Sequence, residues 1–406
     1  MRGTRVLLAG AASLALMLTA CTTDAPEGGP DAADGGNGEG NGSLTPDAEW
    51  FDQAEFDAQL AQRDITPEGS DEEPWLQAIE PDWIDTSDFA IDDPEDATVC
   101  FSNASVSNPW RVTGFITMEQ QVEALVDEGR IGGFRVSDAA DDDNQQISDI
   151  QAFVDAGDCD AIIISPSTTA TLTPAVETAC DSGVPVIVFD RGVNSDCMVT
   201  FIHPIGGYAY GADAADFLVE NLEPGSTVLA LRILPGVDVL EHRWAAAQQI
   251  FGDSELEVLG FEFTGGDGAA IKDLVSQHLQ RGSVDGIWMD AGDGAVAGLE
   301  AFEAAGQPYP VIAGEDELSF MRKWEEEDLT AIAPVYSNFQ WRTPVIAAGM
   351  ILAGEEVPSE WVLPQNPIRQ DELGDYLDLN SDMPSLHYAK FGGEDLPGFP
   401  EAWTDR

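Results

Sequence analysis

The chain has 406 residues, enough for two ordinary domains, and its composition is strongly acidic. It carries 75 aspartates and glutamates against 17 lysines and arginines, which gives a formal net charge of −58 at pH 7. Because nucleic acids and anionic membrane surfaces attract basic proteins, this charge argues against both as partners. Salt would screen the self-repulsion, so we expect a protein suited to salty or alkaline surroundings.

The first 21 residues have the pattern of a secretory signal peptide. A short basic segment, Met1–Arg5, precedes an apolar run over residues 6–18 that is too short to span a bilayer. The run ends in Leu-Thr-Ala-Cys21, which resembles the lipobox of bacterial lipoproteins, in which the cysteine is lipidated. An ordinary signal peptide with a chance cysteine is the alternative. We therefore expect an extracytoplasmic protein that an N-terminal lipid on Cys21 anchors to the cell membrane.

The next segments lead into a region of alternating strands and helices. Residues 22–45 are polar and glycine-rich, which predicts a flexible tether, and residues 46–95 form an acidic extension with scattered aromatic residues. The expected strands of the first half cover residues 98–102, 133–137, 159–165, 183–189 and 199–203, and the helices lie between them. The acid cluster at residues 141–144 favours a capped helix start over a calcium site.

The alternation then begins again and continues to about residue 353. The expected strands cover residues 227–232, 256–263, 286–290, 311–314 and 329–334, with helices over 209–221, 241–251, 269–280, 295–305, 320–327 and 343–353. The remaining tail is rich in proline and is expected to be mostly irregular.

Two runs of alternation predict an α/β fold with two doubly wound parallel-sheet lobes. Lobe 1 is expected over residues 96–204 plus about 338–355, lobe 2 over 205–337, and a C-terminal tail over 356–406 that packs on the lobes. No GxGxxG sequence follows the first strand and no Walker A sequence occurs, so no nucleotide cofactor is expected. Such lobes are more typical of a hinged binding protein than of an enzyme.

Four cysteines remain once Cys21 is assigned to lipid, and an oxidising compartment favours disulfides. Three pairings are possible. Because Cys180 ends an expected helix and Cys197 precedes the next strand, we favour Cys180–Cys197. The cysteines have no CxxC or Cys/His spacing, so no metal site is expected.

The run from Gly183 to Phe189 reads as a buried parallel strand that ends at Asp190 and Arg191. Ligands of open α/β sheets lie beyond the carboxyl ends of the strands, where this charged pair falls. A structural ion pair is the alternative interpretation.

Several segments, in order along the chain, resemble sugar-binding proteins of bacterial ABC importers. These proteins belong to the type I periplasmic-binding-protein superfamily, with the ribose-binding type as the nearest pattern. The matching segments are Phe101–Arg111, Ala161–Pro166, Gly183–Arg191, Arg243 ahead of Ala246-Ala247, and Gly314-Glu-Asp316. The resemblance covers about residues 97–355 and implies two lobes that are joined by three hinge crossings and close on a ligand in the cleft.

The resemblance also implies which side chains contact the ligand. They are Asn108, Trp110 and Arg111 of the first loop, the pair Asp190 and Arg191, Arg243 of the second lobe, and the late carboxylate Asp316. Carboxylates and guanidinium groups suit the hydroxyls of a sugar, and aromatic rings suit its C–H faces.

At three places the sequence departs from the family pattern. Asp290 stands near the position of an expected asparagine, and we take it as the substitute. Gly265-Gly266-Asp267 replaces a segment that holds a stacking ring in relatives. Near the last hinge, Asn338 and Gln340, together with Trp341, are candidates to replace a family glutamine.

We therefore expect a monomeric solute-binding lipoprotein that delivers a monosaccharide or related polyol to an ABC permease and does no chemistry. One alternative is a lipoprotein that presents its ligand to a chemoreceptor or sensor kinase. A secreted glycosidase is disfavoured, because the arginine beside Asp190 would lower the pKa that a general acid needs.

Overall fold

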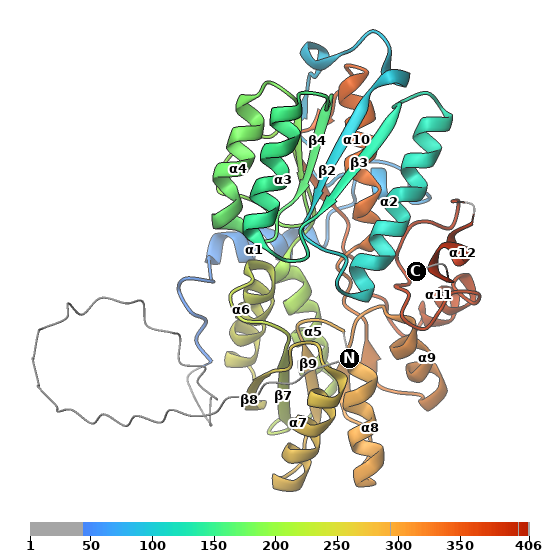
Figure 1. Cartoon of the computed structure of the whole chain (residues 1–406). Coiled ribbons are helices and arrows are strands. Elements are labelled where there is room, and N and C mark those ends of the chain that lie inside the picture. Colours follow the sequence, from blue (N-terminus) through green and yellow to red (C-terminus); the bar gives the residue numbers. More distant parts are fainter. Residues whose placement is uncertain (1–43, 293, 397, 405–406) are drawn as a thin grey trace, which may run out of the picture. The chain divides into compact units, whose positions relative to one another are not determined.

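The computed structural model describes residues 44–292, 294–396 and 398–404, and Figure 1 shows the strands of its two large sheets as two separate groups. The predicted signal peptide, the predicted lipidation site Cys21 and nearly all of the predicted tether therefore lie outside the described residues. Within the described part of the chain, no helix has both the length and the apolarity that a membrane crossing requires.

Lobe 1 contains a six-stranded parallel sheet in the order β13-β6-β5-β4-β2-β3. Its strands are β2 (Thr98–Asn103), β3 (Gly133–Asp138), β4 (Ala161–Ser165), β5 (Val186–Phe189), β6 (Thr200–Pro204) and β13 (Glu360–Leu363). Its helices are α2 (Pro109–Asp127), α3 (Asp143–Ala156), α4 (Thr169–Asp181) and α10 (Thr343–Leu352).

Alternate residues of these strands fill two separate cores, as the twofold period of a strand requires. Phe101, Ile163 and Phe189 face the layer of α2 and α10, whereas Ile162 and Val188 face the layer of α3 and α4. Burial on both sides explains why the central strands are continuous runs of valine and isoleucine.

Lobe 2 contains a five-stranded parallel sheet in the order β11-β10-β9-β7-β8. Its strands are β7 (Thr227–Arg232), β8 (Glu257–Phe263), β9 (Gly286–Met289), β10 (Val311–Ala313) and β11 (Ala331–Ile332). Helices α5 (Gly207–Asn221) and α6 (Asp238–Gly252) share one core with the sheet. Helices α7 (Gly268–Arg281), α8 (Ala295–Ala305) and α9 (Leu318–Glu327) share the other.

The chain passes between the lobes after β6, after β11 and after β13. The last passage is fixed by a bridge between Ala333 and Ile368, and η4 (Asn338–Trp341) lies at the second passage just before α10. The predicted fold of two doubly wound lobes is confirmed.

The N-terminal extension contacts both lobes. Its helix α1 (Gln53–Gln62) buries Phe56 against Tyr208 of α5, and Arg63 pairs with Asp213 of the same helix at 2.8 Å. Beyond a single turn, η1 (Pro74–Leu76), the chain reaches lobe 1, where Ile79 N donates to Val362 O at 2.9 Å. Farther along, β1 (Trp83–Ile84) pairs with β12 (Val357–Pro358), and the single turns η2 (Ser87–Phe89) and η3 (Pro94–Asp96) lead into β2.

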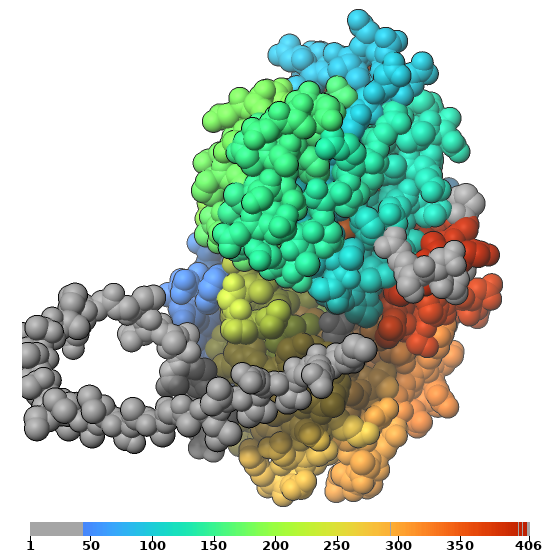
Figure 2. Space-filling model, viewed as in Figure 1, coloured from blue at the N-terminus to red at the C-terminus, as the bar shows by residue number. Residues whose placement is uncertain are grey.

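The C-terminal tail is more regular than the sequence analysis expected. Its strand β13 extends the sheet of lobe 1 beside β6, α11 (Leu373–Leu379) packs on α9, and α12 (Phe399–Thr404) packs on α2. Figure 2 shows this red segment against both the cyan of α2 and the orange of lobe 2. The strand was missed because its short apolar run lies between Pro358 and Pro364, and prolines at strand ends leave the paired residues between them intact.

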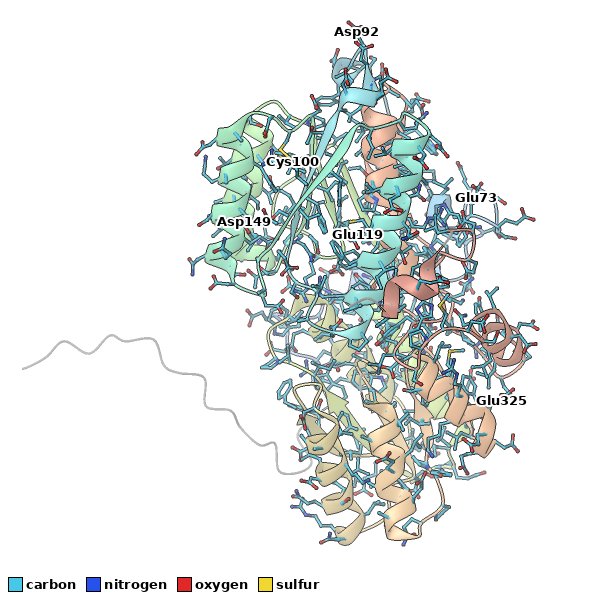
Figure 3. All side chains as sticks on the ribbon, turned by 45° about the vertical axis from the view of Figure 1, so that its right-hand side comes forward. Glu73, Asp92, Cys100, Glu119, Asp149 and Glu325 are labelled. Carbon is cyan, nitrogen blue, oxygen red and sulfur yellow. A yellow bond between two sulfur atoms is a disulfide. The ribbon has the colours of Figure 1, made fainter. Side chains whose placement is uncertain are left out.

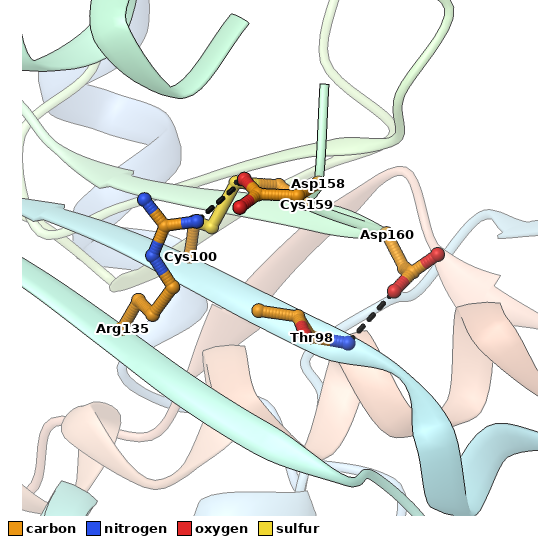
Figure 4. The surroundings of a disulfide bond; sticks show 6 residues. All are labelled: Thr98, Cys100, Arg135, Asp158, Cys159 and Asp160. Atoms are coloured by element: carbon orange, nitrogen blue, oxygen red, sulfur yellow. Dashed lines mark hydrogen bonds and ion pairs between the residues drawn. A yellow bond between two sulfur atoms is a disulfide. The ribbon is translucent and has the colours of Figure 1, made fainter. Parts of the chain in front are cut away.

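Two disulfides join the four described cysteines. Cys100–Cys159 and Cys180–Cys197 have Cα atoms 5.7 and 6.0 Å apart, so the favoured pairing is present. Cys100 lies on β2 and Cys159 just before β4, with the exposed pair Arg135–Asp158 beside them (Figure 4). The bonds tie neighbouring elements of lobe 1 and lie outside the candidate site described below.

Acidic side chains are spread over all parts of the described chain. Figure 3 labels Glu73 and Asp92 of the N-terminal extension, Glu119 and Asp149 of lobe 1, and Glu325 of lobe 2. No group of three histidines, cysteines, aspartates or glutamates within the described residues is arranged to hold a metal ion.

Candidate functional site

An ion pair within lobe 1 joins α2 to the end of β5. Arg111 Nη2 donates to Asp190 Oδ2 at 3.0 Å, and each side chain is only 4% exposed. Asp190 has a φ of 69°, a left-handed conformation that few residues other than glycine, asparagine and aspartate adopt. Strain of this kind is concentrated at functional sites, and here it accompanies a buried charge at a strand end.

Arg191 lies next to this pair. Its Nη1 donates to the backbone oxygen of Ser167. Burial lowers the pKa of Arg191, and the positive charge of Arg111 lowers it further. Asp190 therefore forms an ion pair with Arg111 and attracts Arg191 at longer range, where it raises the pKa of Arg191.

Arg243 approaches from α6 of lobe 2. Its guanidinium carbon lies 3.8 Å from the ring centre of Tyr210 and 4.9 Å from that of Tyr336. Its Nη1 donates to the backbone oxygen of Asp290 and lies 4.0 Å from Glu315 Oε1. The aromatic faces favour the cation, so Arg243 is held in place from both sides.

Tyr336, which precedes η4 at the second crossing, links the groups of lobe 1. Its hydroxyl donates to Asp190 O at 3.1 Å, and Trp110 Nε1 donates to Tyr336 O at 3.0 Å. Burial raises the pKa of Tyr336, and the charge of Asp190 raises it further, so the phenol stays protonated and donates. The rings of Trp110 and Tyr336 pack at a tilt of 44° with their centres 5.8 Å apart.

These side chains line a cavity of about 120 Å³ between the two lobes. Six of the predicted ligand residues line it, together with apolar residues of lobe 2 and three further polar residues. The predicted six are Asn108, Trp110, Arg111, Asp190, Arg191 and Arg243; the further three are Glu315, Tyr336 and Tyr388. A second cavity, of about 260 Å³, shares Asp190, Arg191 and Tyr336 with the first and extends toward α1.

Asn108 lies in the wall but also caps α2. Its side-chain oxygen accepts from Arg111 N at 2.9 Å, which orders the first turn and so places Arg111.

Asp290 lies behind the cavity rather than among the residues that line it. It is fully buried, its Oδ1 accepts from Ile233 N at 2.8 Å, and its Oδ2 lies 3.7 Å from Arg232 Nε. Burial raises the pKa of Asp290 to about 7. Because Ile233 lines the cavity, Asp290 acts here by holding the loop after β7.

Asp316 faces the C-terminal tail. Its Oδ2 accepts from Lys390 N at 2.8 Å, its backbone oxygen accepts from Ala389 N, and burial raises its pKa to about 6. The neighbouring Glu315 faces the cavity instead and accepts from Gly292 N at 2.9 Å and from the Tyr388 hydroxyl at 3.2 Å.

Asn338 and Gln340 are fully buried in η4 and do not line the cavity. Asn338 Nδ2 donates to Trp110 O at 2.7 Å and so steadies the first loop. The amide atoms of Gln340 have no hydrogen-bond partner among the described residues. No ligand contact is assigned to Asp290, Asp316, Asn338 or Gln340 by this geometry.

Sequence reasoning missed Glu315, Tyr336 and Tyr388. The first two lie inside segments that were singled out, Gly314-Glu-Asp316 and the last hinge, beside the residues that were named as ligand contacts. Tyr388 lies in the tail, far outside the resemblance, and no sequence signal marked it.

The comparisons with known proteins identify the family. The model of the periplasmic binding protein domain family matches residues 99–354. The ribose import binding protein of Bacillus subtilis is 25% identical over 282 residues, which cover 68% of this chain and 88% of that protein.

Solved structures share the fold at lower identity. A solute-binding protein of an ABC transporter from Thermobispora bispora has a TM-score of 0.65 and 21% identity, over 75% of this chain and 95% of that one. A solute-binding protein from Bacillus halodurans with bound myo-inositol has a TM-score of 0.63 and 20% identity, over 70% of this chain and 99% of that one. The matched family consists of binding proteins rather than enzymes. Its model spans more than half of the sequence, and the chain therefore belongs to the periplasmic binding protein domain family.

Proposed function

We propose that this protein captures a monosaccharide or related polyol outside the cytoplasm, in the cavity between its lobes, and delivers it to an ABC permease. The observation that carries the proposal is the set of polar side chains from both lobes around one cavity, among them Asp190, Arg191 and Arg243. A ligand that contacts both lobes would favour the closed arrangement, which the permease would recognise.

The chemistry of the wall supports a polyhydroxy ligand. Guanidinium groups donate and carboxylates accept, while Trp110 offers an aromatic face for C–H groups. The related ribose import binding protein and the neighbour with bound myo-inositol are consistent with a ligand of this class. A lipid on Cys21 would keep the protein beside its permease.

A thermal-shift screen over pentoses, hexoses, deoxysugars, polyols and sugar acids tests the proposal, because a ligand that binds the folded state raises its melting temperature. We expect at least one compound to raise it, and Asp190→Ala to abolish the shift for that compound. Asp155→Ala, which removes an exposed acid from α3 of the same lobe, is the matched control and should leave the shift intact. An unchanged shift in Asp190→Ala would place the site elsewhere.

Delivery is tested separately with permease and ATPase subunits from the same cell in liposomes. Uptake of the bound compound that requires this protein supports transport. Binding without stimulated uptake or ATP hydrolysis would favour presentation to a chemoreceptor or sensor kinase instead.

A further inference from the structure

The cavity between the lobes has an unusual share of the few cations of this chain. Of the 17 lysines and arginines in the sequence, Arg111, Arg191 and Arg243 line this one cavity of about 120 Å³. Two carboxylates, Asp190 and Glu315, line it with them. In a protein with a net charge of −58, a wall with more cations than anions is a local reversal of the overall charge.

Arg111 is placed where a cation is least favoured. It lies in the first turn of the 19-residue helix α2, whose N-terminus already carries positive partial charge. Its side chain is 4% exposed, and although Nη2 binds Asp190, Nη1 has no partner among the described residues. A buried guanidinium donor without a partner is costly unless a ligand atom can accept from it.

The other two arginines are also incompletely neutralised. Among the described residues, no carboxylate oxygen lies within 4.0 Å of a nitrogen of Arg191, whose hydrogen bond goes to the backbone of Ser167. Arg243 donates to the backbone oxygen of Asp290 and reaches Glu315 only at 4.0 Å.

The charges of the wall can be counted directly. Three guanidinium groups against the carboxylates of Asp190 and Glu315 leave one positive charge, which a ligand with one carboxylate would balance. A phosphate monoester carries about −1.5 to −2 at pH 7 and would leave the wall with excess negative charge.

We propose that the ligand of this cavity is a sugar acid with a single carboxylate, of the uronate or aldonate type, and that Arg111 and Arg191 bind that carboxylate. The proposal rests on the proposed binding function and narrows its ligand class. A planar guanidinium fork matches a carboxylate in two parallel hydrogen bonds, which makes arginine the suitable residue at this place.

The test compares matched pairs that differ in the carboxylate. Isothermal titration of the full chain with D-galactose and D-galacturonate, D-glucose and D-glucuronate, and D-ribose and D-ribonate should find an acid that binds about 10- to 100-fold more tightly than its neutral partner, the range expected for a charge-assisted hydrogen bond. The corresponding sugar phosphates should bind more weakly than that acid.

Two variants assign the preference to the wall. Arg111→Gln should reduce the ratio of the acid's affinity to that of its neutral partner by about tenfold or more, whatever the variant does to the affinity for the neutral partner itself. Arg191→Gln, which leaves the buried pair of Arg111 intact, is a second test should the first variant fail to fold. Arg135→Gln removes the same charge from an exposed position on β3 and should leave the preference unchanged.

The outcomes separate the two proposals. A neutral sugar or a sugar phosphate that binds at least as tightly as the best acid overturns the sugar-acid proposal and leaves the binding function standing. A loss of preference in Arg135→Gln equal to that in Arg111→Gln also overturns it, because the effect would then come from net charge alone. If no sugar, polyol or sugar acid binds, both proposals fail.

Discussion

Replacing Asp190 should destabilise the protein more than replacing Arg111, its partner in the buried ion pair. Asp190 is bound by Arg111 at 3.0 Å and lies directly before Arg191, whose pKa is lowered by burial and by Arg111 and raised by Asp190. In Asp190→Asn, the buried Arg111 and the partly buried Arg191 repel each other without the nearby carboxylate of residue 190. In Arg111→Met, Asp190 keeps Arg191 as its neighbour, and the repulsion between the two arginines disappears.

The expected magnitude follows from the burial. Breaking a buried ion pair by removing one partner costs about 3–5 kcal/mol, because the remaining charge is left without compensation. We expect Asp190→Asn to lie in this range, which corresponds to a fall of about 4–6 °C in melting temperature for a chain of this size. Arg111→Met should lower the unfolding free energy by about 1–2 kcal/mol less than Asp190→Asn does. The left-handed backbone at residue 190 does not explain the difference, since asparagine tolerates that conformation as well as aspartate does.

Thermal and urea unfolding, followed by circular dichroism on the oxidised protein, measure both variants and the double variant. The pair Arg135–Asp158, with side chains 43% and 59% exposed, provides the control, and its two single variants should each cost no more than about 1 kcal/mol. If Arg111→Met proves as damaging as Asp190→Asn, or more so, this electrostatic account of the pair is refuted.

Three further predictions concern stability. Burial raises the pKa of Asp290 to about 7 and of Asp213 and Asp316 to about 6, well above their unfolded values, so the folded state holds more protons between pH 4 and 7. The unfolding free energy should therefore fall as pH rises through this window. In Asp316→Asn, the unfolding free energy should change less with pH below pH 6. Urea unfolding at four pH values checks both expectations. Added sodium chloride should raise the melting temperature, because it screens a net charge of −58, and a flat or falling curve in differential scanning calorimetry contradicts this. Replacing both cysteines of Cys100–Cys159 should lower the unfolding free energy by about 4 kcal/mol, and replacing both of Cys180–Cys197 should lower it by about 3 kcal/mol. The difference follows from the sequence separations of 59 and 17, because releasing the longer loop adds more entropy to the unfolded chain. Equal losses would argue against a loop-entropy origin.

Most of the fold could be predicted because burial on both faces leaves a clear sequence pattern. Strands such as β4 and β5 are unbroken runs of isoleucine and valine, and the helices between them repeat apolar residues at helical spacing. Strand β13 could not be predicted, because its pairing with β6 depends on a sheet edge that is formed by residues about 160 positions earlier.

Residues of the cavity wall could be predicted where their places follow directly from strand ends and helix starts. Asp190 and Arg191 come straight after β5, and Arg111 lies in the first turn of α2, so topology alone brings them together. The sequence could not show whether Glu315 or Asp316 lines the cavity, because neighbouring residues at a strand end point in different directions. Asp316 accepts a hydrogen bond from Lys390 N of the tail, whereas Glu315 faces the cavity. A one-residue difference of this kind depends on tertiary contacts that leave no local signal.

The segments outside the family match complete the site and also restrain it. The family model ends at residue 354, yet Tyr388 of the tail lines the cavity and binds Glu315. The same tail is held to lobe 2 through Asp316 and to lobe 1 through Arg342, which donates to Gly392 O and pairs with Asp395 at 2.6 Å. With the N-terminal extension, this makes two connections between the lobes beyond the three of the hinge. We expect such connections to limit the opening of the lobes and to hold the arginines of the wall in place before the ligand arrives. A preorganised site loses little ordering entropy on binding, and it rejects a ligand that leaves its buried charges unpaired.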